Sequence, residues 1–234
     1  MNYVKQANGH LYADVLNHGH VVLEQHMGGD LEIANAARMS YAQDSDEMDE
    51  RNEGLLNFLV REKHETPLEM VSFKFDIKAP IFVFREWHRH RIGVSINEQS
   101  GRYSELEREF YVPERDWVRK RVGKPGNYSY DRIDDDVTAE AVRDLIDETQ
   151  GMAFDQYEAM VKAGVALEVA RVVLPVGTYS RMKWKCNLRS LMHFLLLRND
   201  PRAQKEIRAF AKIMEEMAFE IAPVAMAAFV KHNR

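Results

Sequence analysis

Apolar and polar side chains alternate along two stretches of the chain, residues 71–79 and residues 178–186. A period of two is typical of a strand with one buried and one solvated face. The apolar members of the first stretch are Val71, Phe73, Phe75, Ile77 and Ala79. Residues 21–27 favour a third strand, which ends at Gly28-Gly29. We expect these strands to belong to a mostly antiparallel sheet.

Capping residues and helical spacing predict helices between these strands. Gly28-Gly29-Asp30, which ends on a capping aspartate, offers an N-cap for a helix over residues 31–38, and Asn187 offers one for residues 188–197. Pro80 suits the first turn of a helix that continues to Arg91.

The same reasoning predicts helices in four further segments. Leu55, Leu56, Phe58 and Leu59 give a buried face to a helix behind the acidic run of residues 44–53. Asp136 caps a helix that extends to Met160, and a short helix over residues 166–173 ends before Pro175. Asp200-Pro201 starts a helix whose apolar stripe is Ile207, Phe210, Met214, Met217 and Ile221.

Residues 105–126 have no regular period and include two prolines and two glycines. We expect loops and short pieces there, in a segment that can be mobile. The chain has no internal repeat and no low-complexity linker. We therefore predict one α+β domain over residues 1–234, with several helices packed against the sheet.

The composition narrows the class of protein. The 234 residues carry a net charge of -5 and 45% hydrophobic residues, so the bulk charge does not favour nucleic acid or a membrane surface as a partner. No apolar run approaches the roughly 20 residues that span a membrane, and the first residues lack a signal-peptide apolar stretch. We expect a cytoplasmic protein. Cys186 is the single cysteine, and a core position is the favoured interpretation for it.

Residues 85–91, rich in arginine and histidine, and residues 97–103, which follow after a short gap, together form a mixed polar constellation. Arginine forks bind phosphate oxygens, Ser100 adds a hydroxyl, and Gly101 allows close backbone approach. This combination indicates a nucleotide site, and an exposed charged turn is the alternative. His88 and His90 diverge on a helix and have no clear third ligand, so we expect no metal.

A second polar group consists of Arg171, Asn187, Arg189, His193 and Arg198. Arg189 and His193 share one face of the predicted helix, beside apolar residues. A partly desolvated cation requires an anion. Either a bound phosphate or an internal Asp or Glu can supply it, and the residues alone leave both alternatives open.

Arg89-His90-Arg91 followed by Ser100 resembles the Arg-His-Arg, seven residues, Ser signature of flavin-dependent thymidylate synthases. Further segments resemble blocks of the same family in the same order: residues 36–41, 64–69, 78–83, 170–175 and 187–192. One departure is that eight residues, 92–99, separate Arg91 from Ser100. We expect a local bulge near Gly93 to absorb the additional residue, because glycine is permissive.

The resemblance implies an enzyme that makes dTMP from dUMP, with methylenetetrahydrofolate as the one-carbon donor and FAD, reduced by NADPH, as the hydride carrier. It implies FAD contacts from Thr66, Arg89, His90, Arg91, Glu98, Asn187, Arg189 and His193. It implies dUMP contacts from Glu86, Arg89, Glu98, Gln99, Ser100, Gly101, Arg102, Arg171 and Arg198. Arg198 is the expected catalytic residue, at the pyrimidine. The family is a homotetramer with shared active sites.

Two alternatives belong to other classes of function. One is a non-catalytic nucleotide-binding protein that has kept the anion site. The other is a flavin enzyme that methylates uridine in RNA, which is disfavoured because the chain has no added basic domain.

Overall fold

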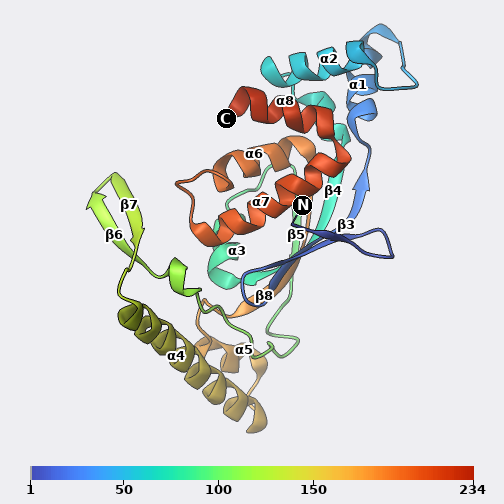
Figure 1. The fold of residues 1–234 in the computed structure, drawn as a ribbon. Coiled ribbons are helices and arrows are strands. Elements are labelled where there is room, and N and C mark those ends of the chain that lie inside the picture. The colour runs from blue at the N-terminus through green and yellow to red at the C-terminus, as the bar shows by residue number, and fades with distance from the viewer. Residues whose placement is uncertain (1) are drawn as a thin grey trace.

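A six-stranded sheet forms the centre of the computed structural model, which describes residues 2–234 (Figure 1). Its strand order is β1-β2-β3-β4-β8-β5, and every neighbouring pair is antiparallel. The strands are β1 (Val4–Lys5), β2 (Leu11–Val15), β3 (Gly19–Met27), β4 (Ser72–Pro80), β5 (Val94–Glu98) and β8 (Tyr179–Asn187). The predicted α+β fold with a mostly antiparallel sheet is confirmed.

Strands β4 and β8 are central because each has a continuous apolar face. They pair along their whole length, with Phe75 opposite Trp184 and Phe73 opposite Cys186. All four of these side chains are at most 1% exposed. The alternation in the sequence thus identified the face of the sheet that packs into the core.

Helices cover that face of the sheet, with α6 and α7 in front of it and α8 next to α2 (Figure 1). The helices are α1 (Asp30–Arg38), α2 (Glu50–Arg61), α3 (Ile81–Trp87), α4 (Asp136–Lys162), α5 (Leu167–Ala170), α6 (Leu188–Arg198), α7 (Lys205–Ile221) and α8 (Pro223–Asn233). Short 3-10 helices are η1 (Met39–Tyr41), η2 (Thr66–Met70), η3 (Arg115–Trp117) and η4 (Arg171–Val173). The predicted stripe of α7 is buried at Ile207, Phe210, Met214 and Met217.

Of three helix N-caps predicted from the sequence, one agrees with the structure and two differ from it. Asn187 caps α6 as predicted, because its side chain accepts a hydrogen bond from the Ser190 amide. The prediction for Asp30 was wrong. Gly29 is the N-cap of α1, and the Asp30 carboxylate instead accepts the backbone N–H groups of Val224 and Ala225, at 2.8 and 2.9 Å. Asp135, not Asp136, caps α4.

Two predicted helix boundaries were also wrong. The first ends at Trp87 instead of Arg91, because the His90 amide closes a turn on the Trp87 carbonyl. The helix expected from Asp200 begins only at Lys205, because the Asp200 carboxylate binds the backbone and side chain of Arg202 in a turn. Strands β1, β2 and β5 and helix α8 were not predicted.

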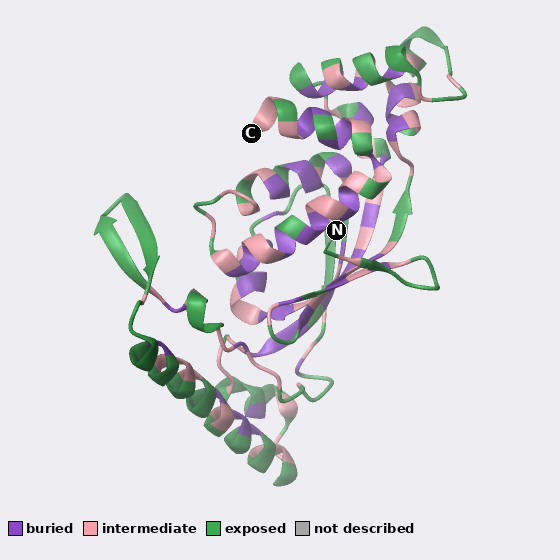
Figure 2. Cartoon of the chain, in the orientation of Figure 1, coloured by how far each residue is buried: buried purple, intermediate pink, exposed green. Residues whose placement is uncertain are grey.

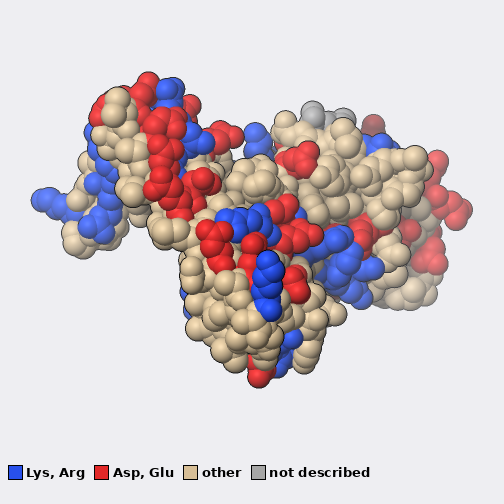
Figure 3. Space-filling view, turned by 90° about the horizontal axis from the view of Figure 1, so that it is seen from below, with Lys and Arg blue, Asp and Glu red and all other residues tan. Residues whose placement is uncertain are grey.

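Residues 105–126, expected to be irregular, include η3 and the strand β6 (Arg119–Lys124). This strand pairs with β7 (Asn127–Arg132), in a hairpin that projects away from the six-stranded sheet and is almost wholly exposed (Figure 2). Lys and Arg side chains gather at the left edge of the molecule seen from below (Figure 3). Helix α4 packs on α5 through a small second core around Phe154 and Tyr157.

The second face of the sheet carries charged side chains, although one of them is buried. Asp76 on β4 is 1% exposed, and it pairs with Arg181 and Lys183 on the neighbouring strand. Burial raises the pKa of the Asp76 carboxyl, but hydrogen bonds from Arg181, His20 and Lys183 outweigh burial and hold the pKa well below its usual range. In residues 2–234, no helix is long and apolar enough to cross a membrane.

Candidate functional site

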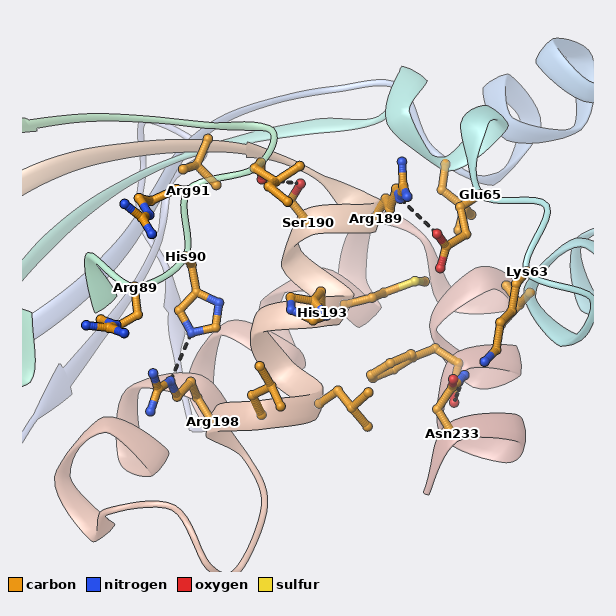
Figure 4. Close-up of a pocket in the computed structure, with 18 residues that line it drawn as sticks. Lys63, Glu65, Arg89, His90, Arg91, Arg189, Ser190, His193, Arg198 and Asn233 are labelled. Carbon is orange, nitrogen blue, oxygen red and sulfur yellow. Dashed lines mark hydrogen bonds and ion pairs between the residues drawn. The ribbon is translucent and has the colours of Figure 1, made fainter. Parts of the chain in front are cut away.

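A cleft of about 510 Å³ opens between helix α6, the turn that follows α3, and helix α8 (Figure 4). Arg89, His90, Arg91 and Arg198 lie at one end, which we call the cationic end. Lys63 and Asn233 lie at the other end, and apolar side chains of α6 and α8 lie between the two. Charged groups at the ends of an apolar cleft are typical of a small-molecule site.

The backbone after α3 brings the Arg-His-Arg motif to the cleft. Gly93 lies in the turn before β5 and has a positive φ of 67°. A Cβ on Gly93 would lie 2.3 Å from the Ser190 hydroxyl, so the close approach of this turn to α6 requires glycine. From Val94 onward, β5 pairs with β8 in regular register. The positive-φ turn at Gly93 therefore precedes the strand, and β5 itself has no register shift.

Two guanidinium groups of the cationic end have no acidic partner. Arg89 and Arg91 are exposed, and within residues 2–234 no carboxylate lies within 4.0 Å of either. Guanidinium groups without an acidic partner favour an anion with several oxygens, such as a phosphate or a diphosphate.

Arg189 differs, because it has two acidic partners in its own chain. Its Nε lies 2.8 Å from a Glu65 oxygen, and its Nη1 lies 2.6 Å from a Glu69 oxygen. Of the two alternatives for this cation, the structure contains the internal ion pair. His193, one turn later, is exposed on the same wall of the cleft.

Arg198 is held by three hydrogen bonds within the chain. Its Nε donates to His90 Nε2 at 2.9 Å, its Nη1 to a Glu86 carboxylate oxygen at 2.6 Å, and its Nη2 to the Glu86 carbonyl at 3.0 Å. Asp200 does not pair with Arg198, since it binds Arg202. The position at the end of α6 was predicted, whereas these partners were not.

Burial affects the pKa of both partners of Arg198. Desolvation raises the pKa of the Glu86 carboxyl, with Arg198 opposing the shift and Glu206 adding to it. Desolvation, together with the charges of Arg198 and His193, lowers the pKa of His90 to about 4. His90 is therefore neutral near pH 7, and its Nε2 is free to accept a hydrogen bond.

Five of the eight residues expected at a flavin line the cleft: Arg89, His90, Arg91, Arg189 and His193. The other three do not. Thr66 begins η2 next to Glu65, and the Asn187 side chain is used as the cap of α6. Glu98 accepts a hydrogen bond from the Ser180 hydroxyl at 2.8 Å and lies 3.4 Å from His88.

The residues expected at the nucleotide, apart from Arg89 and Arg198, do not line this cleft. Residues 98–102 form the end of β5 and the turn after it, where the Ser100 hydroxyl accepts hydrogen bonds from the Arg102 amide and Nε at 3.4 and 3.5 Å. Gln99 donates to the Ser104 hydroxyl. The Arg171 side chain packs against Gly101, since a Cβ added to Gly101 would lie 3.4 Å from the Cδ of Arg171. Glu86 is held by Arg198, as described above.

The residues of the cleft wall that sequence reasoning missed include Lys63, Glu65, Phe229 and Asn233. Glu65 lies four residues before Glu69, a spacing that presents two carboxylates on one side of a turn, but its partner is more than 100 residues away. Phe229 and Asn233 were missed because α8 was not recognised as a separate helix.

Cys186 has no part in this site. It is 1% exposed in the core, and burial raises the pKa of its thiol well above the usual value. A thiol in this environment does not ionise readily and is a poor nucleophile. Across residues 2–234, no three His, Cys, Asp or Glu side chains are grouped as metal ligands would be.

Comparison with known proteins agrees with the sequence motifs. The family profile described as "Thymidylate synthase complementing protein" matches residues 22–224. A flavin-dependent thymidylate synthase of Thermus thermophilus is 44% identical over 96% of this chain and 80% of its own length. One of Gluconobacter oxydans is 40% identical over 94% of this chain and 73% of its own length.

A solved structure has the same fold over nearly the whole chain. It is PolB, a UMP/dUMP methylase from Streptomyces cacaoi bound with 5-Br dUMP, with a TM-score of 0.83 and 36% sequence identity over 94% of this chain and 98% of PolB. Together with the Arg-His-Arg turn and the cleft it borders, these relationships show that the chain belongs to the flavin-dependent thymidylate synthase family.

Proposed function

We propose that the protein makes dTMP from dUMP, with methylenetetrahydrofolate as the one-carbon donor and FAD, reduced by NADPH, as the hydride carrier. The observation that carries this proposal is the cationic end of the cleft. It combines two arginines without acidic partners, Arg89 and Arg91, with a third, Arg198, that its own chain orients.

The chemistry of the cleft fits FAD. A volume of about 510 Å³ lies within the range of cofactor sites. Arg89 and Arg91 can bind a diphosphate, and apolar side chains such as Met192 and Phe229 can contact a flat ring system. FAD, once bound, supplies the hydride that completes the methyl group. Its binding residues in this proposal are Thr66, Arg89, His90, Arg91, Glu98, Asn187, Arg189 and His193.

In this proposal dUMP binds to the residues that follow β5. Ser100 and Arg102 bind the phosphate of dUMP, since a hydroxyl and an arginine fork suit its oxygens. Glu86, Arg89, Glu98, Gln99, Gly101 and Arg171 complete the contacts, and Arg198 faces the pyrimidine. The methylase PolB, solved with 5-Br dUMP bound, supports this choice of ligand.

More than one copy of the chain forms each site in this proposal. Within one chain, residues 98–102 and Arg171 do not line the cleft that holds the arginine motif. A homotetramer with shared active sites accounts for this separation, because the nucleotide residues of one copy can complete the cleft of another.

The residues of this chain have definite tasks in the reaction. Arg198 donates to the pyrimidine and stabilises the negative charge that develops on the ring. No enzyme thiol attacks the ring, because Cys186 is buried away from the cleft with a raised pKa. The walls of the cleft orient the ring and exclude water from it.

UMP is the second candidate substrate, because PolB has also been solved with 5-Br UMP bound. The two nucleotides differ only in the 2′-hydroxyl. Competition between labelled dUMP and unlabelled UMP in the same assay measures which of the two nucleotides the protein prefers. We expect dUMP to be used with the higher kcat/KM.

Tritium release from C5-labelled dUMP tests the proposed function. The purified protein should be yellow, release FAD on denaturation, and release tritium only when methylenetetrahydrofolate and NADPH are both present. Nucleotide binding without tritium release would instead support the non-catalytic alternative. Release from uridine in RNA, but not from dUMP, would support the RNA methyltransferase.

A further inference from the structure

Two side chains of one short segment hold the guanidinium group of Arg198. Glu86 lies in the last turn of α3, and His90 lies in the turn that follows it. Both reach the last residue of α6, which is Arg198. The Glu86 carbonyl that accepts from Nη2 belongs to the C-terminal end of α3, where a cation is favoured. The ends of two helices are therefore joined through one guanidinium group.

The hydrogen bonds leave a defined set of donors free. Arginine has five N–H groups, and Arg198 uses one on Nε, one on Nη1 and one on Nη2. One N–H on each terminal nitrogen remains. The side chain is 19% exposed and lines the cleft, so these two donors are available to a ligand there.

The His90 ring is fixed by the core beneath it. It is 9% exposed and packs edge-to-face on Phe194, with ring centroids 4.9 Å apart. Phe194 in turn stacks on Trp87 at 4.8 Å, and Trp87 and Phe194 are both fully buried. A ring supported in this way holds its Nε2 at one place. Because Nε2 accepts from Arg198, the proton of the neutral ring lies on Nδ1.

We propose that His90 is a positioning residue for Arg198: its Nε2, together with the Glu86 carboxylate, aims the two free N–H groups of the guanidinium into the cleft. This assignment replaces two contacts of the proposed function: His90 acts on the reaction through Arg198 and does not bind the flavin, and Glu86 anchors the fork and is not a primary nucleotide contact. The inference deepens the proposed function, on which it rests for the identity of the ligand. The geometry itself involves only residues of this chain.

Two variants of His90 separate positioning from direct contact with a cofactor. His90→Gln places an amide oxygen near the position of Nε2 and keeps an acceptor for Arg198. His90→Leu keeps apolar contact with Phe194 but removes the acceptor. His26→Leu is the matched control, because His26 is exposed on β3 and does not line the cleft. Thermal unfolding of all three identifies any variant that fails to fold.

Crystal structures of the ligand-free variants give the first readout, which is independent of activity. We expect the Arg198 fork to stay in place in His90→Gln and to move by about 1 Å or more in His90→Leu, a displacement that can lower a rate about 100-fold. At saturating substrates, kcat of His90→Gln should stay within about threefold of the wild type, and kcat of His90→Leu should fall by about 10- to 100-fold. FAD content should remain close to that of the wild type in both.

An unmoved Arg198 fork in His90→Leu would overturn the inference, as would loss of FAD and of activity to the same extent in both His90 variants. Failure of the proposed function has a different signature. The wild-type protein would then release no tritium from dUMP, while the ligand-free structures would still decide whether His90 positions Arg198.

Discussion

Replacing Arg198 with alanine removes two groups of hydrogen bonds that the structure distinguishes. Three bonds run to His90 and Glu86 inside the chain, and two N–H groups remain for a ligand. The first group affects stability. The second affects turnover, provided that the pyrimidine carries more negative charge in the transition state than in the ground state.

The structure sets the size of each effect. A net internal hydrogen bond contributes about 0.5–1.5 kcal/mol, and the pair is partly solvated, so we expect Arg198→Ala to lower the free energy of unfolding by about 1–2 kcal/mol. The Glu86 side chain, 26% exposed, then loses its cation, and its pKa rises further. Two hydrogen bonds to a charged ligand contribute about 1.5–3 kcal/mol each. Their loss from the transition state lowers kcat by roughly 150- to 25,000-fold.

Tritium release at saturating dUMP and folate measures this loss, with FAD occupancy read from absorbance. Arg198→Lys should recover only part of the activity, because it keeps the charge but not the planar fork. Arg202→Ala is the control: its side chain is 91% exposed and pairs with Asp200 alone, so kcat should not change. If Arg198→Ala keeps full FAD and near wild-type kcat, the residue merely ends α6, and the assignment of the catalytic arginine is wrong.

Three further predictions concern other parts of the molecule. Arg102→Ala should raise the KM for dUMP by about 10- to 100-fold with little change in FAD content, since its fork is assigned to the phosphate; equal loss of both ligands would indicate a structural arginine. Asp30→Ala should lower the free energy of unfolding in urea by about 2 kcal/mol and Asp30→Asn by less, because asparagine keeps one acceptor for the start of α8; equal effects of the two would contradict this. Asp76→Asn should lower the free energy of unfolding by about 2–3 kcal/mol at pH 7. Because the pKa of Asp76 is lowered in the fold, the contribution of its carboxylate is present above about pH 4 and is lost at lower pH, so the difference from wild type should narrow toward about pH 3; a constant difference would refute the ion-pair explanation.

The elements that the sequence predicted correctly are those whose signals are local. Strands β4 and β8 have one continuous apolar face each, and Asn187 caps the helix that follows it directly. Strand β5 escaped prediction because it is a short edge strand, exposed or half-exposed at every position, in which only Val94 and Ile96 alternate with polar residues. Helix α8 escaped because Ala222-Pro223 interrupts an apolar stretch without a polar cap of its own.

The functions of single charged residues depended on partners far away in the sequence. Asp30 is the first residue of α1, and its carboxylate binds a helix that begins nearly 200 residues later. Arg189 could have met a ligand or an internal acid, and only the folded chain brings Glu65 and Glu69 to it. The sequence correctly predicted that Arg198 lies at the C-terminal end of α6. It could not indicate the bonds to Glu86 and His90, because these depend on how α3 packs beside α6.

The contact between Asp30 and the start of α8 also bears on how the chain is made. Asp30 leaves the ribosome 195 residues before Ala225, an interval of roughly 10–40 s at about 5–20 residues per second. During that interval the carboxylate has no helix N-terminus to bind, and the surface of α2 that packs on α8 is uncovered. Phe229 and Asn233 of α8 also form part of the cleft wall. A nascent chain arrested before Pro223 therefore already contains the Arg-His-Arg turn and Arg198, but it cannot yet enclose a ligand.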